Sequence, residues 1–142
     1  MERKKIVVID ASVVVKWFIE EDYFKEARLL RDAYINGLIN LAAPSLLHYE
    51  VLNALKFSGG FGEEELKEVA GALDDYQITL YDLKGELATK TIELSMRKGI
   101  TVYDASYVAL AYILDTVVYT SDEKLIQRIR DPVHVKHIRE SV

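Results

Sequence analysis

Two aspartates follow apolar segments at points where their carboxyl groups could act together. Asp10 comes directly after residues 6–9, and Asp122 follows residues 116–120. Both segments are rich in β-branched and aromatic side chains, which is typical of strands buried in a parallel sheet. Parallel strands bring their carboxyl ends to one edge of the sheet, where α/β proteins bind ligands. We therefore expect both carboxylates at the same edge.

Two further acids are compatible with that edge. Asp104 precedes a helical segment, residues 105–114, which leads into the strand that ends before Asp122. Glu50 lies inside a mostly apolar helical segment, and Asn53 follows three residues later on the same helix face. A Glu and an Asn on the inner side of a helix need polar partners.

Four carboxyl groups in one pocket favour a bound cation. Without one they repel each other, and some of them stay protonated. Sites built only from oxygen, with positions left for water, suit Mg²⁺ or Mn²⁺. Such an ion acidifies a bound water and polarises a phosphate, and Glu50 could bind it directly or through water. The hypothesis is a metal site that hydrolyses phosphodiesters, formed by Asp10, Glu50, Asp104 and Asp122.

Each acid also has a purely structural explanation. Asp10, Asp104 and Asp122 each stand where a helix N-cap is expected, and aspartate is a favoured cap. For Glu50 the alternative is a solvated helix residue. Only the convergence of the four acids favours chemistry.

The elements that must position these acids alternate between strand and helix. Expected strands cover residues 6–9, 38–43, 77–81, 116–119 and 133–138. Expected helices cover residues 13–18, 20–35, 44–57, 82–98, 105–114 and 123–130, with one more that begins at Glu63. In this scheme Pro44 sits in a first helical turn, Asp82 caps a helix, and residues 100–103 form an extended link. The alternation predicts an α/β fold with a mainly parallel sheet of about four to five strands flanked by helices.

Length and composition predict a single globular domain spanning residues 1–142. Half of the residues are hydrophobic, no apolar run approaches the ~20 residues of a membrane span, and cysteine is absent. These features favour a cytoplasmic protein without disulfides or a membrane anchor. A net charge of −5 argues against a protein that coats DNA regardless of sequence. Nucleic acid would need a bound cation or a basic rim, for which the candidates are Lys124, Arg128, Arg130, Lys136 and Arg139.

Four blocks of sequence carry a family resemblance. They are VVIDASVVVKW at 7–17, APSLLHYEVLNAL at 43–55, GITVYDASYVALA at 99–111 and VYTSDEKL at 118–125. Together, in this order and over essentially the whole chain, they resemble the PIN-domain nucleases, and most of all the VapC-type toxins of toxin–antitoxin pairs.

This resemblance implies both a site and an activity. The family's acids correspond to Asp10, Glu50, Asp104 and Asp122, and its supporting hydroxyl and amide groups to Ser12, Asn53 and Ser121. It also implies a PIN-like three-layer fold, cleavage of single-stranded or structured RNA with Mg²⁺ or Mn²⁺, an antitoxin partner and a homodimer. Apolar residues around Gly59 and Gly60, including Phe57 and Phe61, are a candidate for the dimer surface.

Three other classes of protein compete with this assignment. A receiver-type phosphoacceptor would typically carry an acidic pair after the first strand, whereas Ala11 follows Asp10. A haloacid-dehalogenase-like phosphatase would carry a second Asp two residues on, where this chain has Ser12. A catalytically silent PIN-like module that only binds RNA or an antitoxin stays open, because the sequence separates binding from catalysis poorly.

Overall fold

A five-stranded sheet forms the centre of the protein, described here for residues 4–141 by a computed structural model. Its strands are β1 (Lys5–Ile9), β2 (Ile39–Pro44), β3 (Thr79–Tyr81), β4 (Val118–Thr120) and β5 (Val135–His137). They run in the order β3-β2-β1-β4-β5, and all neighbouring pairs are parallel. This architecture confirms the predicted fold class, and it makes β1 and β4 neighbours.

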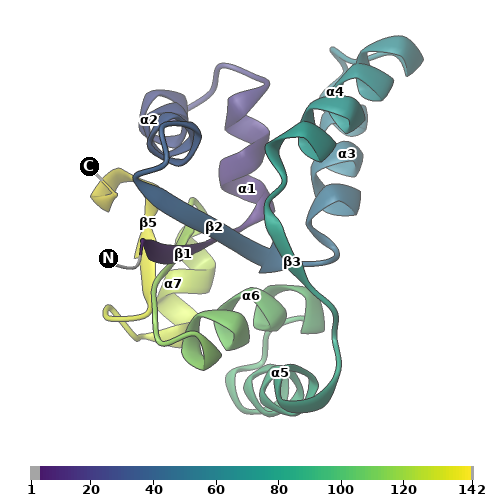
Figure 1. Cartoon of the computed structure of the whole chain (residues 1–142). Coiled ribbons are helices and arrows are strands. Elements are labelled where there is room, and N and C mark those ends of the chain that lie inside the picture. The colour runs from purple at the N-terminus through teal and green to yellow at the C-terminus, as the bar shows by residue number, and fades with distance from the viewer. Residues whose placement is uncertain (1–3, 142) are drawn as a thin grey trace.

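Helices cover both faces of the sheet and give three layers. The α-helices are α1 (Ala11–Val14), α2 (Phe24–Ile35), α3 (Leu47–Ser58), α4 (Glu63–Tyr76), α5 (Gly85–Lys98), α6 (Val102–Ile113) and α7 (Glu123–Ile129). Two short 3₁₀ helices, η1 (Val15–Trp17) and η2 (Ile138–Glu140), complete the described elements. Helices α1 and α2 lie on one side of the sheet and α5 and α6 on the other, while α3 and α4 form a projecting hairpin (Figure 1). Among residues 4–141, no helix has both the length and the apolar character needed to cross a bilayer.

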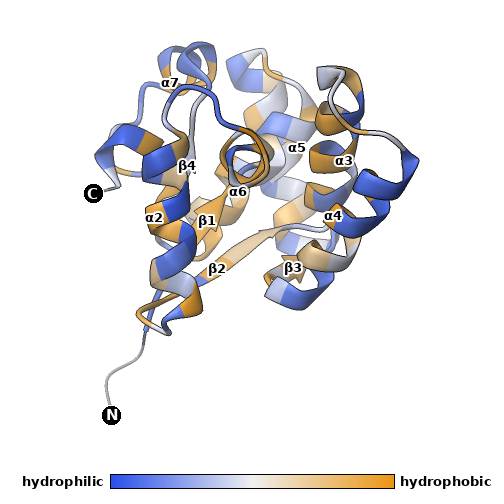
Figure 2. Ribbon diagram, turned by 90° about the horizontal axis from the view of Figure 1, so that it is seen from above, coloured by the Kyte–Doolittle hydropathy of each residue, from blue (hydrophilic) through white to orange (hydrophobic). Residues whose placement is uncertain are grey.

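The core lies where the central strands meet α6. Three successive residues of β1 (Val7, Val8, Ile9) and three of β2 (Leu41, Ala42, Ala43) are buried, as expected for strands covered on both faces. Helix α6 is buried without interruption over residues 105–111. Most of β1 and β2 is accordingly hydrophobic, whereas the outer faces of α2 and α4 are hydrophilic (Figure 2). A helix buried on all sides is held rigidly, and α6 carries Asp104 in its first turn.

Two predicted helix starts in the first half of the chain are wrong. Pro44 is the last residue of β2, paired with Tyr81, and not part of a first helical turn. Proline has no N–H to donate, so the ladder continues through the Ser45 N–H, 2.9 Å from the Tyr81 carbonyl oxygen. The acidic residues 20–22 precede α2, which begins only at Phe24 because Tyr23 adopts a left-handed conformation with φ 68°.

Two further predictions, both about caps, are also wrong. Lys84, not Asp82, is the N-cap residue of α5. The extended link predicted at residues 100–103 is helical in its second half, because α6 already begins at Val102, where the Thr101 hydroxyl caps the helix by accepting the Asp104 N–H at 3.0 Å. Asp104 therefore lies inside the first helical turn and is not its cap.

Candidate active site

Neighbouring strands deliver two of the four predicted acids to one edge. Asp10 follows β1 and Asp122 lies two residues beyond β4. The Asp10 N–H donates to the Tyr119 carbonyl oxygen at 3.3 Å, which fixes the two strand ends against each other. Both acids stand at the carboxyl edge of the sheet, as the two strand-ending segments predicted.

Asp10 is the most deeply buried of the acids, with 7% of its surface exposed. Its Oδ1 accepts the Ser12 hydroxyl at 2.6 Å and the Val13 N–H at 3.3 Å. Asp10 therefore does cap α1, as its structural explanation required. Burial raises its pKa from 3.8 to about 6, although hydrogen bonds from Ser12, Thr120 and Val13 oppose that rise. A buried carboxyl with so high a pKa is typical of functional sites.

Ser12 joins the loop after β1 to the loop after β4. Its hydroxyl donates to Asp10, accepts the Ser121 N–H at 3.0 Å and lies 3.4 Å from the Thr120 hydroxyl. The predicted supporting position Ser121 thus contributes its backbone amide to this link. Thr120 also accepts the Asp122 N–H at 3.0 Å, so a short chain of hydrogen bonds runs from Asp10 to Asp122.

Glu50 is held from across the sheet edge by a tyrosine. The Tyr107 hydroxyl of α6 donates to Glu50 Oε1 at 2.7 Å, and Tyr107 is itself only 2% exposed. Burial raises the pKa of Glu50, the Tyr107 hydrogen bond lowers it, and the charge of Asp104 raises it. Glu50 is therefore half-buried and hydrogen-bonded. This excludes the alternative explanation that it is simply a solvated helix residue.

Asp104 is the electrostatic centre of the group. Burial raises its pKa first, the charge of Asp122 adds to the rise, and the Thr101 hydrogen bond opposes it. The Asp104 charge in turn raises the pKa of both Asp10 and Glu50. Asp104 therefore couples to each of the other three acids.

Asp122 is exposed and serves as the N-cap of α7. Its Oδ1 accepts the Lys124 N–H at 3.0 Å and the Leu125 N–H at 3.2 Å. Its structural explanation is thus correct, and the helix end holds its carboxylate at the rim of the site.

The donor set suits a hard divalent cation because it consists of carboxylate oxygens whose mutual repulsion a cation would neutralise. Nevertheless, within residues 4–141 no three Asp, Glu or His side chains already form a group that could hold a metal ion. One oxygen of Asp10 and one of Asp122 are used by helix caps, and the acids come from four separate elements. The chemistry of the site fits the ion, and binding would require the carboxylates to draw together.

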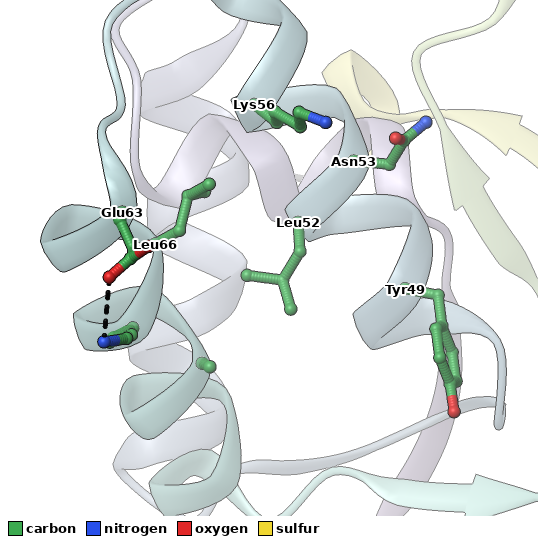
Figure 3. Close-up of a pocket in the computed structure, with 8 residues that line it drawn as sticks. Tyr49, Leu52, Asn53, Lys56, Glu63 and Leu66 are labelled. Carbon is green, nitrogen blue, oxygen red and sulfur yellow. Dashed lines mark hydrogen bonds and ion pairs between the residues drawn. The ribbon is translucent and has the colours of Figure 1, made fainter.

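Asn53 lies one turn beyond Glu50 and is exposed. It lines a hollow of about 580 Å³ together with Leu46, Tyr49, Glu50 and Tyr103. On its other side it borders an apolar groove between α3 and α4, into which Leu52 and Leu66 extend (Figure 3). Asn53 is therefore placed to meet a ligand beside the acids.

Two polar side chains of the site were missed as supporting groups in the sequence. Tyr107 lies three residues after Asp104 and so shares its helix face, a spacing that could have indicated it. Thr120 stands at the strand end directly before the predicted Ser121, which was its only signal.

The basic residues of the C-terminal segment do not form one free rim beside the acids. Arg128 donates to the Gly99 carbonyl oxygen at 2.9 Å, and Arg139 pairs with Glu123 at 2.7 Å. Lys136 lines a hollow with Lys5 and Asp115 at the amino edge of the sheet, opposite the acids. Lys124 in α7 and Arg130 directly after it are exposed, and Lys124 lies two residues from Asp122.

Comparison with known proteins agrees with this architecture. The PIN domain family model matches residues 7–131. Ribonuclease VapC1 of Mycobacterium tuberculosis is 33% identical over 93% of this chain and 97% of its own length. Ribonuclease VapC3 of Pyrobaculum aerophilum is 29% identical over 86% of this chain and 93% of its own.

Solved structures show the same fold at lower identity. A crystal structure from Pyrobaculum aerophilum superimposes with a TM-score of 0.66 at 20% identity, covering 96% of this chain and 85% of that one. A toxin–antitoxin complex from Klebsiella pneumoniae superimposes with a TM-score of 0.64 at 16% identity, covering 84% of this chain and 89% of that one. With the family model matching most of its length and a relative that is one-third identical, the chain belongs to the PIN domain family.

Proposed function

We propose that this protein is a metal-dependent endoribonuclease and the toxin of a toxin–antitoxin pair. The observation that carries the proposal is the placement of Asp10 and Asp122 after the neighbouring strands β1 and β4, where hydrogen bonds through Ser12 and Thr120 link them. The charge of Asp104 raises the pKa of Asp10 and of Glu50, which is consistent with all four acids facing one site. The PIN family membership and two relatives named as ribonucleases supply the reaction class.

Each proposed residue has a distinct task. Asp10, Glu50, Asp104 and Asp122 would hold Mg²⁺ or Mn²⁺, which when bound polarises the scissile phosphate and acidifies a water molecule. Ser12 keeps the carboxylate of Asp10 oriented, and Tyr107 does the same for Glu50. Ser121 ties the loop of Asp122 to that of Asp10 through its backbone amide.

The test is cleavage-site mapping on total RNA with EDTA, Mg²⁺ or Mn²⁺. Wild-type protein should produce new, metal-dependent RNA ends, and Asp10→Asn should produce none. Asp115→Asn is the matched control, because Asp115 is an exposed aspartate at the opposite edge of the sheet. If wild-type protein leaves RNA intact with either metal but still binds it, the silent binding module replaces the nuclease.

The proposed partners are an antitoxin and a second copy of this chain, within one cytoplasmic PIN-like domain. The matched Klebsiella structure is a toxin–antitoxin complex, which supports the antitoxin. Of the two phenylalanines proposed for a dimer surface, Phe57 on α3 is 75% exposed, whereas Phe61 packs against the core. Phe57 is therefore the residue through which the dimer can be tested. Light scattering should give a dimer that Phe57→Glu shifts toward monomer, and a wild-type monomer at high concentration would refute it.

A further inference from the structure

Two exposed tyrosines border the hollow beside the acids. Tyr49 on α3 is 78% exposed and Tyr103 on α6 is 63% exposed. Both line the hollow of about 580 Å³ that Glu50 also lines. Two aromatic rings therefore stand in solvent next to one of the proposed metal-binding carboxylates.

Burial distinguishes these two rings from other aromatic residues around the site. Tyr107 is buried and bonded to Glu50, and Trp17 is buried with its indole N–H donating to the Ala27 carbonyl oxygen at 2.9 Å. Those rings are accounted for by the core. Tyr49 and Tyr103 have no such burial, although exposing a large aromatic surface to water is unfavourable.

The helix geometry brings recognition groups of different kinds together. Tyr49 and Asn53 are four residues apart, so they lie on the same face of α3 and extend from the same side of it (Figure 3). Glu50 lies farther round the helix, toward Tyr107 of α6. From α4 toward the acids, α3 thus presents apolar Leu52, then Tyr49 with Asn53, and then Glu50.

The chemistry of this hollow fits a nucleobase better than a phosphate. Its walls are Leu46 and the two tyrosines, and its polar groups are the Asn53 amide and the Glu50 carboxylate. A carboxylate repels a phosphate in the absence of a cation, whereas a flat neutral base can stack on an aromatic ring and bond to an amide. A base in this hollow would leave its own phosphate near the acids.

We propose that Tyr49 and Tyr103 stack on one unpaired base of the RNA substrate and that Asn53 contacts the edge of that base. This inference rests on the proposed ribonuclease function, and it assigns the position next to the cut to a single-stranded nucleotide. Base pairing at that position would keep the base in the duplex and away from the tyrosines.

The test measures binding of short fluorescein-labelled oligoadenylate and oligouridylate by anisotropy, in the Asp10→Asn background so that nothing is cut. Tyr49→Leu and Tyr103→Leu should each weaken binding about tenfold to a hundredfold, the range for losing one stacked base. Tyr49→Phe and Tyr103→Phe keep the ring and should bind like the parent. Leu38→Ala is the surface control, because Leu38 is exposed and directly precedes β2 at the amino edge of the sheet.

A second arm removes the base instead of the ring. Single abasic substitutions are placed along the oligonucleotide in turn. At one position the missing base should weaken binding strongly for the parent protein and leave the binding of Tyr49→Leu unchanged. Annealing the complementary strand should reduce binding to the level of the leucine variants. If the leucine variants bind single strands like the parent, or every abasic position costs the same in both proteins, the stacking proposal is wrong.

The experiments distinguish failure of the proposed ribonuclease function from failure of the base-stacking inference. If wild type cleaves RNA but the leucine variants cleave and bind normally, only the stacking inference falls. If wild type never cleaves but the tyrosine-dependent binding is present, the nuclease falls and the base-binding hollow stands. If the hollow instead binds a protein ligand, neither oligoadenylate nor oligouridylate will displace that ligand. This result would count against RNA as the occupant of the hollow.

Discussion

At the scale of single residues, Asp10 links folding stability to pH. Its folded pKa of about 6 lies above the 3.8 of an ordinary aspartate, so the folded protein holds this proton more tightly than the unfolded chain. The contribution of Asp10 to the free energy of unfolding therefore falls as pH rises from about 4 to about 6. Above about pH 6 the folded protein bears the full cost of an ionised Asp10. The burial that raises the pKa makes the ionised form costly.

Asp10→Asn should remove this penalty and most of the repulsion from Asp104. Without metal, we expect the variant to gain stability relative to wild type as pH rises from 4 to 7, by about 1–3 kcal/mol. The asparagine oxygen can still accept from Ser12 and the Val13 N–H. Denaturant unfolding in EDTA at several pH values is the measurement, and a difference that does not vary with pH would contradict the prediction.

Tyr107→Phe tests whether the hydroxyl that holds Glu50 matters for chemistry. The variant removes a donor that lowers the pKa of Glu50, so that pKa should rise and metal affinity should fall. We expect cleavage to drop about tenfold to a hundredfold, as is usual when a ligand loses its supporting partner. Single-turnover cleavage at several Mn²⁺ concentrations measures the loss.

Tyr34→Phe is the control for a lost tyrosine hydroxyl. The Tyr34 hydroxyl donates to the Tyr76 carbonyl oxygen at 2.6 Å, away from the acids. This variant should lose about 1 kcal/mol of stability and keep its metal response. Equal losses of cleavage in the two variants would show that Tyr107 acts only on the fold.

At the scale of elements, the start of α6 decides where Asp104 stands. Thr101 caps the helix and bonds the backbone N–H of Asp104 itself. Asp104 then sits in the first turn, where the helix dipole favours its negative charge. The sequence pattern predicts a helix that begins three residues later, at Ala105, with Asp104 as its cap.

Thr101→Ala should cost about 1 kcal/mol of stability, because the N-cap hydrogen bond is lost. Without the cap, the first turn of α6 should fray and Asp104 should lose its fixed position. RNA cleavage should then fall even at temperatures well below the melting temperature. Thr101→Ser retains the hydroxyl and should restore both properties. Thermal melts and cleavage rates at one low temperature separate the effects; unchanged cleavage in Thr101→Ala would show that the cap does not position Asp104.

At the scale of the whole molecule, the four proposed metal-binding acids come from four separate elements, so a divalent cation bound between them should tie these elements together. A ligand that binds only the folded state stabilises it, by about 2.7 kcal/mol at a hundred times its dissociation constant. Mn²⁺ or Mg²⁺ should therefore raise the melting temperature of wild type by several degrees. The rise should shrink below pH 6 as Asp10 becomes protonated.

Asp104→Asn should abolish most of this metal-induced rise, because Asp104 couples to each of the other acids. Its metal-free melting temperature should stay level or increase, since repulsion is relieved. Asp115→Asn should respond to metal like wild type. A similar metal-induced rise in all three proteins would place the ion somewhere other than this site.

Features of the fold that depend on a local pattern are predictable from the amino-acid sequence. The β-branched segments before Asp10 and Asp122, and their alternation with helices, predicted the parallel sheet and the common edge of these two acids. Glycines at the ends of α3 and α5 marked helix stops, and both Gly59 and Gly99 adopt the left-handed conformation that ends a helix. Such signals lie within a few residues of the element they define.

Contacts between side chains that are distant in the sequence become visible only in the folded protein. Tyr107 reaches Glu50 across 57 positions of sequence, and Ser12 reaches Ser121 across 109. The exposure of Tyr49 and Tyr103, in contrast to the burial of Tyr107, likewise depends on which helix faces α3 and α6 cover. These contacts depend on the packing of whole elements, because no pattern along the chain records the distance between residues that folding brings together.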